Sequence, residues 1–421
     1  MEKSKYIIRI IFVIAIIMFG KFFLSSSMLF FRLLVGVGLG YALTRAAMGF
    51  AGSVNRAYNT GSTKLIKVLM WMFLGTAAVN IAFLYNVEAS SYGLWINQIN
   101  LGLILGGLLF GFGMTFSACC ASGVLTDLVT GLPRAGITLL FFGMGVFLGF
   151  PLQKTASWIT DSWFTTETGA KLSGGVYLPD LFKWDGLNGY LGAILLTALF
   201  AGIIAYIAKK YEEKRVMKNT YIGVESEKEQ YKIYPEDIKK EFKLLSKSTY
   251  EIIFVRPWTM RTGAIAITSL FALLMGVTKM GWGASTPYGF WFGKLLLTLG
   301  VPVESLVEFT GKSSKVFTMA FFSHPINTQN FGIILGTFIY FILAGTFFKV
   351  FKSELKITFK DGALFALGGL AMGFGTRLSN GCNVGALYTP IANFSLSGWI
   401  FLVFLILGGI FGNKIAAKIK G

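Results

Sequence analysis

The sequence predicts an all-α polytopic membrane protein with about ten crossings, broken or re-entrant helices, and two inverted repeats. Of its 421 residues, 54% are hydrophobic and only 14% are charged, and the mean hydropathy is +0.65. Many separate apolar stretches approach the roughly 20 residues that a helix needs to cross a bilayer. The two halves of the chain also contain related glycine-rich segments. A soluble protein could not bury this much apolar sequence.

The apolar stretches define ten predicted crossings, including one at the N-terminus that resembles a signal peptide. Basic residues precede that stretch, but no small-residue cleavage site follows and the next apolar stretch comes at once. We therefore interpret it as a transmembrane helix. The predicted crossings are 7–24, 28–48, 65–85, 99–117, 136–150, 188–208, 262–281, 330–350, 362–378 and 398–413.

Basic residues concentrate in alternate connections and predict the orientation of the chain. They occur before residue 10, at 45–67, at 209–261, at 352–360 and after 413. By the positive-inside rule these connections are cytoplasmic, which leaves 86–98, 151–187 and 301–329 outside. The chain is then a multi-pass protein of the cell membrane, which in a bacterium is the inner membrane. Both of its termini lie in the cytoplasm.

These signals divide the chain into six predicted parts. The segment 209–250 is rich in Lys and Glu and separates the two halves. The parts are an N-terminal transmembrane helix (1–27), a first repeat (28–150), an outside connection (151–187), a linking transmembrane helix (188–208), a charged cytoplasmic linker (209–260) and a second, inverted repeat (261–421).

The internal repeat is the most informative feature of the sequence. Residues 106–136 align without gaps on 368–398, with 11 identities in 31 positions, and the paired residues include Cys120 with Cys382 and Ser117 with Ser379. A weaker match joins 44–49 to 278–283. In the predicted topology the two copies run in opposite directions. Inverted repeats place a substrate site near the bilayer midplane, where broken helices direct backbone groups at the ligand.

The glycines and the cysteines can each be interpreted in two ways, as residues that allow close helix packing or as parts of a functional site. The glycine pairs Gly36/Gly40, Gly107/Gly111 and Gly145/Gly149 fit close helix contact as well as broken helices. A single intramembrane cysteine is commonly a small buried hydrophobe. Cysteine at the same point of two repeats favours a shared site, so Cys120 and Cys382 are predicted to lie on opposite sides of one polar path.

Polar and charged residues near the motifs complete the candidate pathway. Asn380 and Asn383 would be costly against lipid and should face protein or water. Arg45 and Arg377 are candidates for attracting an anion, but Arg45 also fits ordinary positive-inside charge and Arg377 fits snorkelling or an acidic partner. Asp127 is more readily explained as a helix cap or solvated turn residue.

Several function classes find little support in the residues. Three cysteines and the single His324 offer too few ligands for a metal site or disulfide framework, so neither a metal nor another cofactor is expected. The charge of +18 follows topology and shows no basic groove with interleaved aromatics, which argues against a nucleic-acid partner. The chain lacks a Walker-type loop for ATP.

At these motifs the sequence resembles the YeeE/YedE family of sulfur-compound permeases. The resemblance rests on the Gly-Phe-Gly and Cys elements of both halves, the segment TRAAMGF at 44–50 and His-Pro-Ile-Asn-Thr-Gln at 324–329. It implies import of thiosulfate or related sulfur or selenium species along a path of cysteines. Cys120 and Cys382 match two family cysteines. A third is replaced in this chain by Gly49, and Cys119 stands where relatives usually carry glycine.

The sequence therefore favours a permease for a small sulfur-containing anion. A neutral thiol is a weak donor that can contact such an anion without adding charge, and weak successive sites suit permeation. Two alternatives remain open. One is a sulfur relay, in which Cys120 or Cys382 forms a persulfide for a cytoplasmic sulfur-accepting protein. The other is a structural subunit whose motifs only pack. Apart from the anion and the possible sulfur acceptor, membrane lipid is the expected partner.

Overall fold

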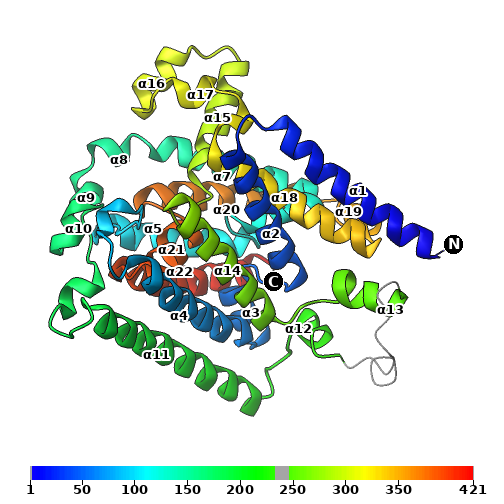
Figure 1. The fold of residues 1–421 in the computed structure, drawn as a ribbon, viewed down its shortest axis with the longest axis horizontal. Helices are drawn as coiled ribbons and strands as arrows, with labels where there is room; N and C mark the ends of the chain where they lie inside the picture. The colour runs from blue at the N-terminus through cyan, green and yellow to red at the C-terminus, as the bar shows by residue number, and fades with distance from the viewer. Residues whose placement is uncertain (1, 233–245, 421) are drawn as a thin grey trace.

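The computed structural model describes residues 2–232 and 246–420 (Figure 1). Residues 233–245 of the predicted charged linker, together with residues 1 and 421, lie outside the described residues. Within the described ranges the chain is helical and contains no β-sheet; only two isolated bridges occur, at Gly93 with Met280 and at Tyr177 with Ser395. The all-α prediction is confirmed.

The chain forms a succession of long helices joined by short helices and turns. The α-helices are α1 (Glu2–Phe23), α2 (Ser27–Arg45), α3 (Gly52–Thr60), α4 (Lys64–Leu84), α5 (Leu101–Ser117), α6 (Gly123–Thr130), α7 (Leu132–Gly149), α8 (Leu152–Thr155), α9 (Ser157–Thr160), α10 (Glu167–Lys171), α11 (Tyr190–Met217), α12 (Glu225–Glu229), α13 (Lys247–Tyr250), α14 (Met260–Thr278), α15 (Thr286–Thr298), α16 (Val303–Thr310), α17 (Lys315–Thr318), α18 (Pro325–Ala344), α19 (Phe347–Ser353), α20 (Phe359–Leu378), α21 (Thr389–Ala392) and α22 (Leu396–Lys420). Short π-helical turns cover Glu251–Val255 and Asn383–Tyr388.

Eight of the described helices are long and apolar enough to cross a membrane. They are α1, α2, α4, α7 with α8, α11, α14, α18 and α22, and each corresponds to one of the ten predicted crossings. The other two predicted crossings correspond to α5, a shorter apolar helix, and to α20. These two helices carry the repeated motifs. The chain is thus a multi-pass membrane protein.

Helix pairs in the interior meet through glycine, as one of the two sequence interpretations predicts. Gly36 and Gly40 of α2 lie against the backbone of α18, where an added Cβ would come within 2.1 Å of the Gln329 carbonyl oxygen or 2.0 Å of that of Ile333. Gly107 and Gly111 lie against α22 in the same way, and Gly145 and Gly149 lie against α20. Lipid tails are as apolar as the helix surfaces, so the hydrophobic effect does little to hold helices together in a membrane. Close packing at small residues stabilises their association instead.

The direction of each contact can be followed from residue to residue. Gly36 lies beside Gly332 and Val37 beside Gly336, so α2 and α18 run parallel. In contrast, α5 and α20 run antiparallel, because Gly106 lies beside Gly375 and Gly113 beside Gly368. The main pairs are α2 with α18, α4 with α14, α5 with α22, α7 with α20, and α5 with α20. In Figure 1, α5, α20 and α22 occupy the middle of the molecule, while α1 and α11 lie at its edges.

Both motif helices break at the same point of the repeat. Helix α5 ends at Ser117, whose hydroxyl donates to the carbonyls of Gly113 and Cys119. Helix α20 ends at Ser379, whose hydroxyl donates to the carbonyls of Gly375 and Gly381. The next residue is left-handed in each copy, with φ of 56° at Ala118 and 57° at Asn380. Alanine rarely adopts this conformation, so the break is built by the surrounding fold.

The described part of the charged linker is anchored to the first half of the chain. Glu227 of α12 is buried, accepts a hydrogen bond from the Ser62 hydroxyl at 2.6 Å and lies 3.6 Å from the Arg56 guanidinium. Gln230 donates to the Ala46 carbonyl at 2.8 Å. Residues of a segment that looks solvent-exposed in sequence therefore help to cover one end of the helical core.

Candidate functional site

The three cysteines lie inside the protein and none faces lipid. Cys120 and Cys382 are 0% exposed and Cys119 is 3% exposed. Helices α5 and α20 run antiparallel and end at opposite ends of their contact, Ser117 beside Gly368 and Ser379 beside Gly106. The turn after the second break packs back against α5, where Asn383 donates to the Met114 sulfur.

The break after α5 turns a backbone donor toward the Cys120 thiol. The Gly123 amide, at the start of α6, donates to the Cys120 sulfur at 3.4 Å, and the Ser122 hydroxyl lies 3.5 Å from the same sulfur. The carbonyls of Cys120 and Cys382 accept from Val124 and Ala386, respectively, at 2.8 and 2.6 Å. The two motifs share this local geometry, so each presents its cysteine at the beginning of a new helical turn.

A cavity of about 240 Å³ reaches Cys119 and Cys120 from the side of α3 and α6. Two ion pairs border it, Arg56 with Glu227 at 3.6 Å and Asp127 with Arg134 at 3.3 Å. Asp127 therefore has an ion partner in addition to its place in α6. The cavity has thiols at its inner end and charged groups at its mouth.

Gly49 lines the same cavity as Cys120. A Cβ added at Gly49 would meet no atom within 4 Å, and Gly49 is not among the residues with positive φ. A side chain at position 49 would therefore enter open space without backbone strain. The structure brings together Gly49, Cys119 and Cys120, all of which the sequence singled out.

Arg377 is a buried cation without a carboxylate partner among residues 2–232 and 246–420. Arg377 is 4% exposed, and within the described residues its guanidinium donates hydrogen bonds only to hydroxyls, Thr376 at 3.2 Å, Thr286 at 3.3 Å and Ser285 at 3.5 Å. These are long hydrogen bonds for a guanidinium. Arg377 lies in the last turn of α20, five residues before Cys382 in the sequence. An acidic partner was one explanation that the sequence allowed for a charged residue at position 377. The described residues contain no such partner.

A second cation lies near the same aromatic ring as Arg377. The Lys312 ammonium lies 5.0 Å and the Arg377 guanidinium 5.6 Å from the centre of the fully buried Phe150 ring. Burial lowers the pKa of Lys312, and the neighbouring Arg377 charge lowers it further. Two cations that repel each other in a partly desolvated place form a natural site for an anion.

The two motif asparagines have different environments. Asn380 donates to Gln98 at 2.9 Å and accepts from Gln153 at 2.6 Å, which forms a short polar chain after the break of α20. Asn383 donates to the Met114 sulfur at 3.1 Å, and its buried side-chain oxygen has no hydrogen-bond partner among the described residues. Both face protein, as the cost of amides in lipid predicts.

Arg45 lies apart from this group. Its guanidinium donates to the carbonyls of Arg256 at 2.8 Å, Ile252 at 2.7 Å and Ile253, and it lies 4.7 Å from the Trp258 ring centre. Arg45 thus ties the end of α2 to the π-helical turn before α14. It is absent from the lining of the cavity that contains Gly49.

Fully buried aromatic residues surround the motifs; of these, the sequence indicated only Trp282, as an interface anchor or packing residue. Tyr288 is fully buried and donates its hydroxyl to the Ala121 carbonyl, between Cys120 and Ser122 in the sequence. The rings of Phe50 and Trp282 surround Tyr388 at centroid distances of 6.0 and 6.3 Å. The sequence signal that could have pointed to Tyr288 is the weak repeat match at 278–283, which ends five residues before it.

Comparison with known proteins agrees with this arrangement. A family model described as sulphur transport matches residues 45–411. The thiosulfate transporter TsuA of Spirochaeta thermophila is 25% identical over 389 residues, which cover 90% of this chain and 97% of that protein. TsuA of Escherichia coli is 24% identical over 390 residues, covering 91% and 93%. The probable transporter YedE of Escherichia coli is 28% identical over 165 residues, covering 38% of each chain. This chain is a membrane protein of the sulphur transport (YeeE/YedE) family.

Proposed function

We propose that the protein is a permease that passes thiosulfate or a related sulfur or selenium anion into the cytoplasm. The observation that carries the proposal is Arg377, a buried cation at the end of α20 whose hydrogen bonds within the described residues go only to hydroxyls, five residues before Cys382 in the sequence. An uncompensated charge in the protein interior is costly, and a passing anion would offset that cost. The names of the two TsuA relatives support thiosulfate as the anion to test first.

The inverted topology is part of this proposal. In the repeat, α2 corresponds to α14, α4 to α18, α5 to α20 and α7 to α22. The contact of α2 with α18 therefore corresponds to that of α14 with α4, and the contact of α5 with α22 to that of α20 with α7. All four contacts occur. The antiparallel contact of α5 with α20 supports a pseudo-two-fold axis in the membrane plane. With the basic connections inside, the termini and the Cys120 cavity face the cytoplasm, whereas Arg377 and Lys312 face outward.

The proposed path has three stages between the two faces. An anion first meets Lys312 and Arg377, then the thiol of Cys382, and then Cys120 and the cytoplasmic cavity. Tyr288 is fully buried and its hydroxyl donates to the Ala121 carbonyl, next to Cys120 in the sequence, so passage requires that this bond be released or that the ring move. Each thiol contact is weak, which allows the anion to leave as readily as it arrives.

Uptake into proteoliposomes tests the function directly. Labelled thiosulfate, sulfite and selenite are offered to the purified protein with and without an imposed pH gradient. We expect uptake of at least one of these anions above that of protein-free vesicles. A persulfide trapped on Cys120 or Cys382 during turnover would favour the sulfur-relay alternative, and no uptake of any anion would contradict the permease.

A cysteine at position 49 is expected to shift selectivity. The Gly49→Cys side chain would enter the cavity beside Cys120 and supply one more thiol donor. One such contact contributes about 0.5–1.5 kcal/mol, so the ratio of thiosulfate to sulfite uptake should rise up to about tenfold. Gly49→Ala is the matched control, because it fills space without adding a thiol. Unchanged ratios in Gly49→Cys would remove position 49 from the pathway.

A further inference from the structure

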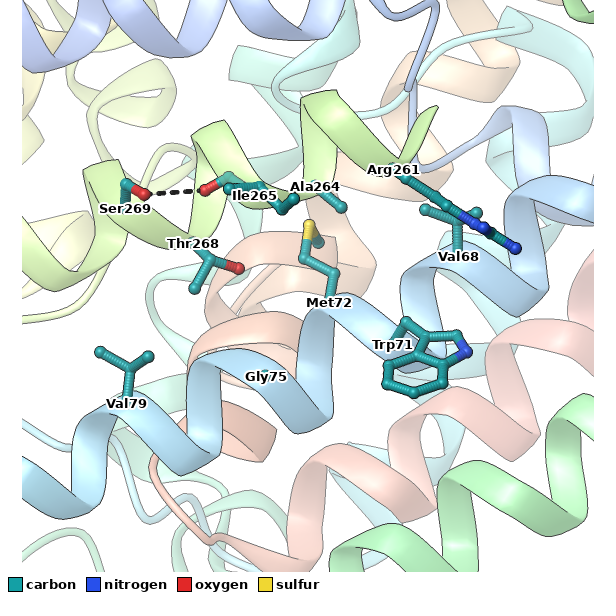
Figure 2. Close-up of a pocket in the computed structure, with 10 residues that line it drawn as sticks. All are labelled: Val68, Trp71, Met72, Gly75, Val79, Arg261, Ala264, Ile265, Thr268 and Ser269. Atoms are coloured by element: carbon teal, nitrogen blue, oxygen red, sulfur yellow. Dashed lines mark hydrogen bonds between the residues drawn. The ribbon is translucent and has the colours of Figure 1, made fainter. Parts of the chain in front are cut away.

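A long groove lies between α4 and α14 on the outside of the helical core (Figure 2). It has a volume of about 640 Å³, and its lining is largely apolar. Two of its residues, Trp71 and Ile265, are 74% and 70% exposed. Both flanking helices are candidate membrane spans, so the groove opens toward the acyl chains of the bilayer.

The groove is a departure from the symmetry of the repeats. The equivalent pair, α2 with α18, is closed by glycines that meet backbone atoms of the opposite helix. Helix α4 also carries a glycine at the contact, Gly75, but a Cβ there would meet no atom within 4 Å. Figure 2 shows Gly75 in the floor of the groove, flanked by Met72, Val79 and Thr268. The missing side chain therefore leaves room for a ligand instead of for the neighbouring helix.

One end of the groove is basic. Arg261 lines it and also lines an adjoining pocket of about 550 Å³, whose other charged residues are Lys64, Lys67 and Glu227, the last of these buried and paired with Arg56. Lys67 is paired with Glu212 at 3.1 Å, and Lys64 lies 5.7 Å from the Tyr231 ring centre. Arg261 is exposed and has no ion pair within the described part of the chain. This end belongs to the connections with concentrated basic residues, where the headgroups of the cytoplasmic leaflet would lie.

From these features we infer that the groove binds an anionic phospholipid. One acyl chain lies between α4 and α14 over Gly75, and the phosphate contacts Arg261, with Lys64 and Lys67 nearby. An apolar channel that ends at a cluster of cations complements both parts of such a molecule, whereas a free phosphate would use only the basic end. Basic pockets at the cytoplasmic ends of transmembrane helices attract anionic headgroups.

The groove also touches the core that separates the two motifs. The Thr268 hydroxyl lies 2.9 Å from that of Thr76, which lies 2.9 Å from the Tyr388 hydroxyl. Tyr388 is in ring contact with Phe50 and Trp282. A lipid over Thr268 would therefore hold α4 and α14 in place around this cluster. The inference concerns lipid binding and does not depend on which anion is transported.

Retention of lipid by the purified full chain tests the inference. The protein is exchanged into detergent containing equal amounts of phosphatidylglycerol and phosphatidylcholine with identical acyl chains, and bound lipid is counted by native mass spectrometry. We expect one phosphatidylglycerol to be retained in preference. Arg261→Gln should lower that preference about fivefold, because a basic residue near a phosphate contributes about 1 kcal/mol. Lys418→Gln, which removes an equal charge at the end of α22, should leave the preference unchanged.

A second variant probes the acyl part of the groove. Gly75→Leu would fill the space over α4 and should reduce retention of both lipids, whereas Gly202→Leu on the exposed face of α11 should not. Soluble glycerol phosphate should fail to compete with phosphatidylglycerol. Equal retention of the two lipids, or a preference that Arg261→Gln does not change, would overturn the inference. Competition by glycerol phosphate alone would also overturn it, as would a dimer with Trp71 at its interface.

Discussion

Replacement of Arg377 with glutamine is expected to lower anion uptake about thirtyfold or more while the protein remains folded. Loss of one partner from a buried charge pair costs about 2 kcal/mol or more, and 2 kcal/mol corresponds to roughly thirtyfold in affinity. In the unliganded protein Arg377 has no carboxylate partner within the described ranges, so its removal leaves no orphaned charge. The thermal unfolding midpoint of Arg377→Gln should therefore equal or exceed that of the parent.

Arg45 provides a matched control for this experiment. It is also a buried arginine at the end of a helix, but it donates to three backbone carbonyls and lies over Trp258. Arg45→Gln should lower the unfolding midpoint because several carbonyls lose a charged donor. Arg377→Lys should retain part of the uptake, since the ammonium keeps the charge without the planar fork. Full uptake by Arg377→Gln would contradict an anion site at this residue.

Removal of either paired thiol is expected to reduce uptake of every transported anion. Cys120→Ala and Cys382→Ala each delete a weak donor in a fully buried place. A contact of this kind contributes about 0.5–1.5 kcal/mol, which corresponds to a reduction of up to about tenfold for each variant. Initial rates in proteoliposomes measure the effect.

Cys119 offers the matched comparison for the thiol variants. It is buried in the same cavity as Cys120, but its counterpart in the second motif is Gly381. Cys119→Ala should therefore reduce uptake less than Cys120→Ala. Parent-level uptake by the Cys120→Ala and Cys382→Ala double variant would show that the paired motifs serve helix contacts alone, as the structural-subunit alternative states.

The sequence was most informative about features that depend on one segment at a time, such as the length of an apolar stretch. Apolar length identified all eight helices that are long enough to span, because each must satisfy its own backbone hydrogen bonds in lipid. The glycine pairs Gly36/Gly40, Gly107/Gly111 and Gly145/Gly149 also indicated real helix contacts. Sequence could not choose between contact and breakage, and the structure contains both: glycines mediate the contacts, and Ser117 and Ser379 end the helices.

The candidate site was only partly accessible from sequence. Alignment of the repeats paired Cys120 with Cys382, since a duplicated segment keeps its spacing. It could not separate Arg45 from Arg377, because both are single basic residues near a predicted helix end. Only the fold shows that carbonyls surround Arg45, whereas hydroxyls and an aromatic ring surround Arg377.

The sequence by itself determined the membrane class, the helical spans, the repeat and the paired cysteines, because these follow from local hydropathy and from identities at fixed spacing. Tertiary structure decided which cation lacks a partner, that Lys312 and Phe150 join Arg377, and that α4 and α14 leave a groove where α2 and α18 close. These features arise between segments that are far apart in the sequence. Burial and ion pairing depend on what the opposite helix presents, and a linear pattern does not contain that information.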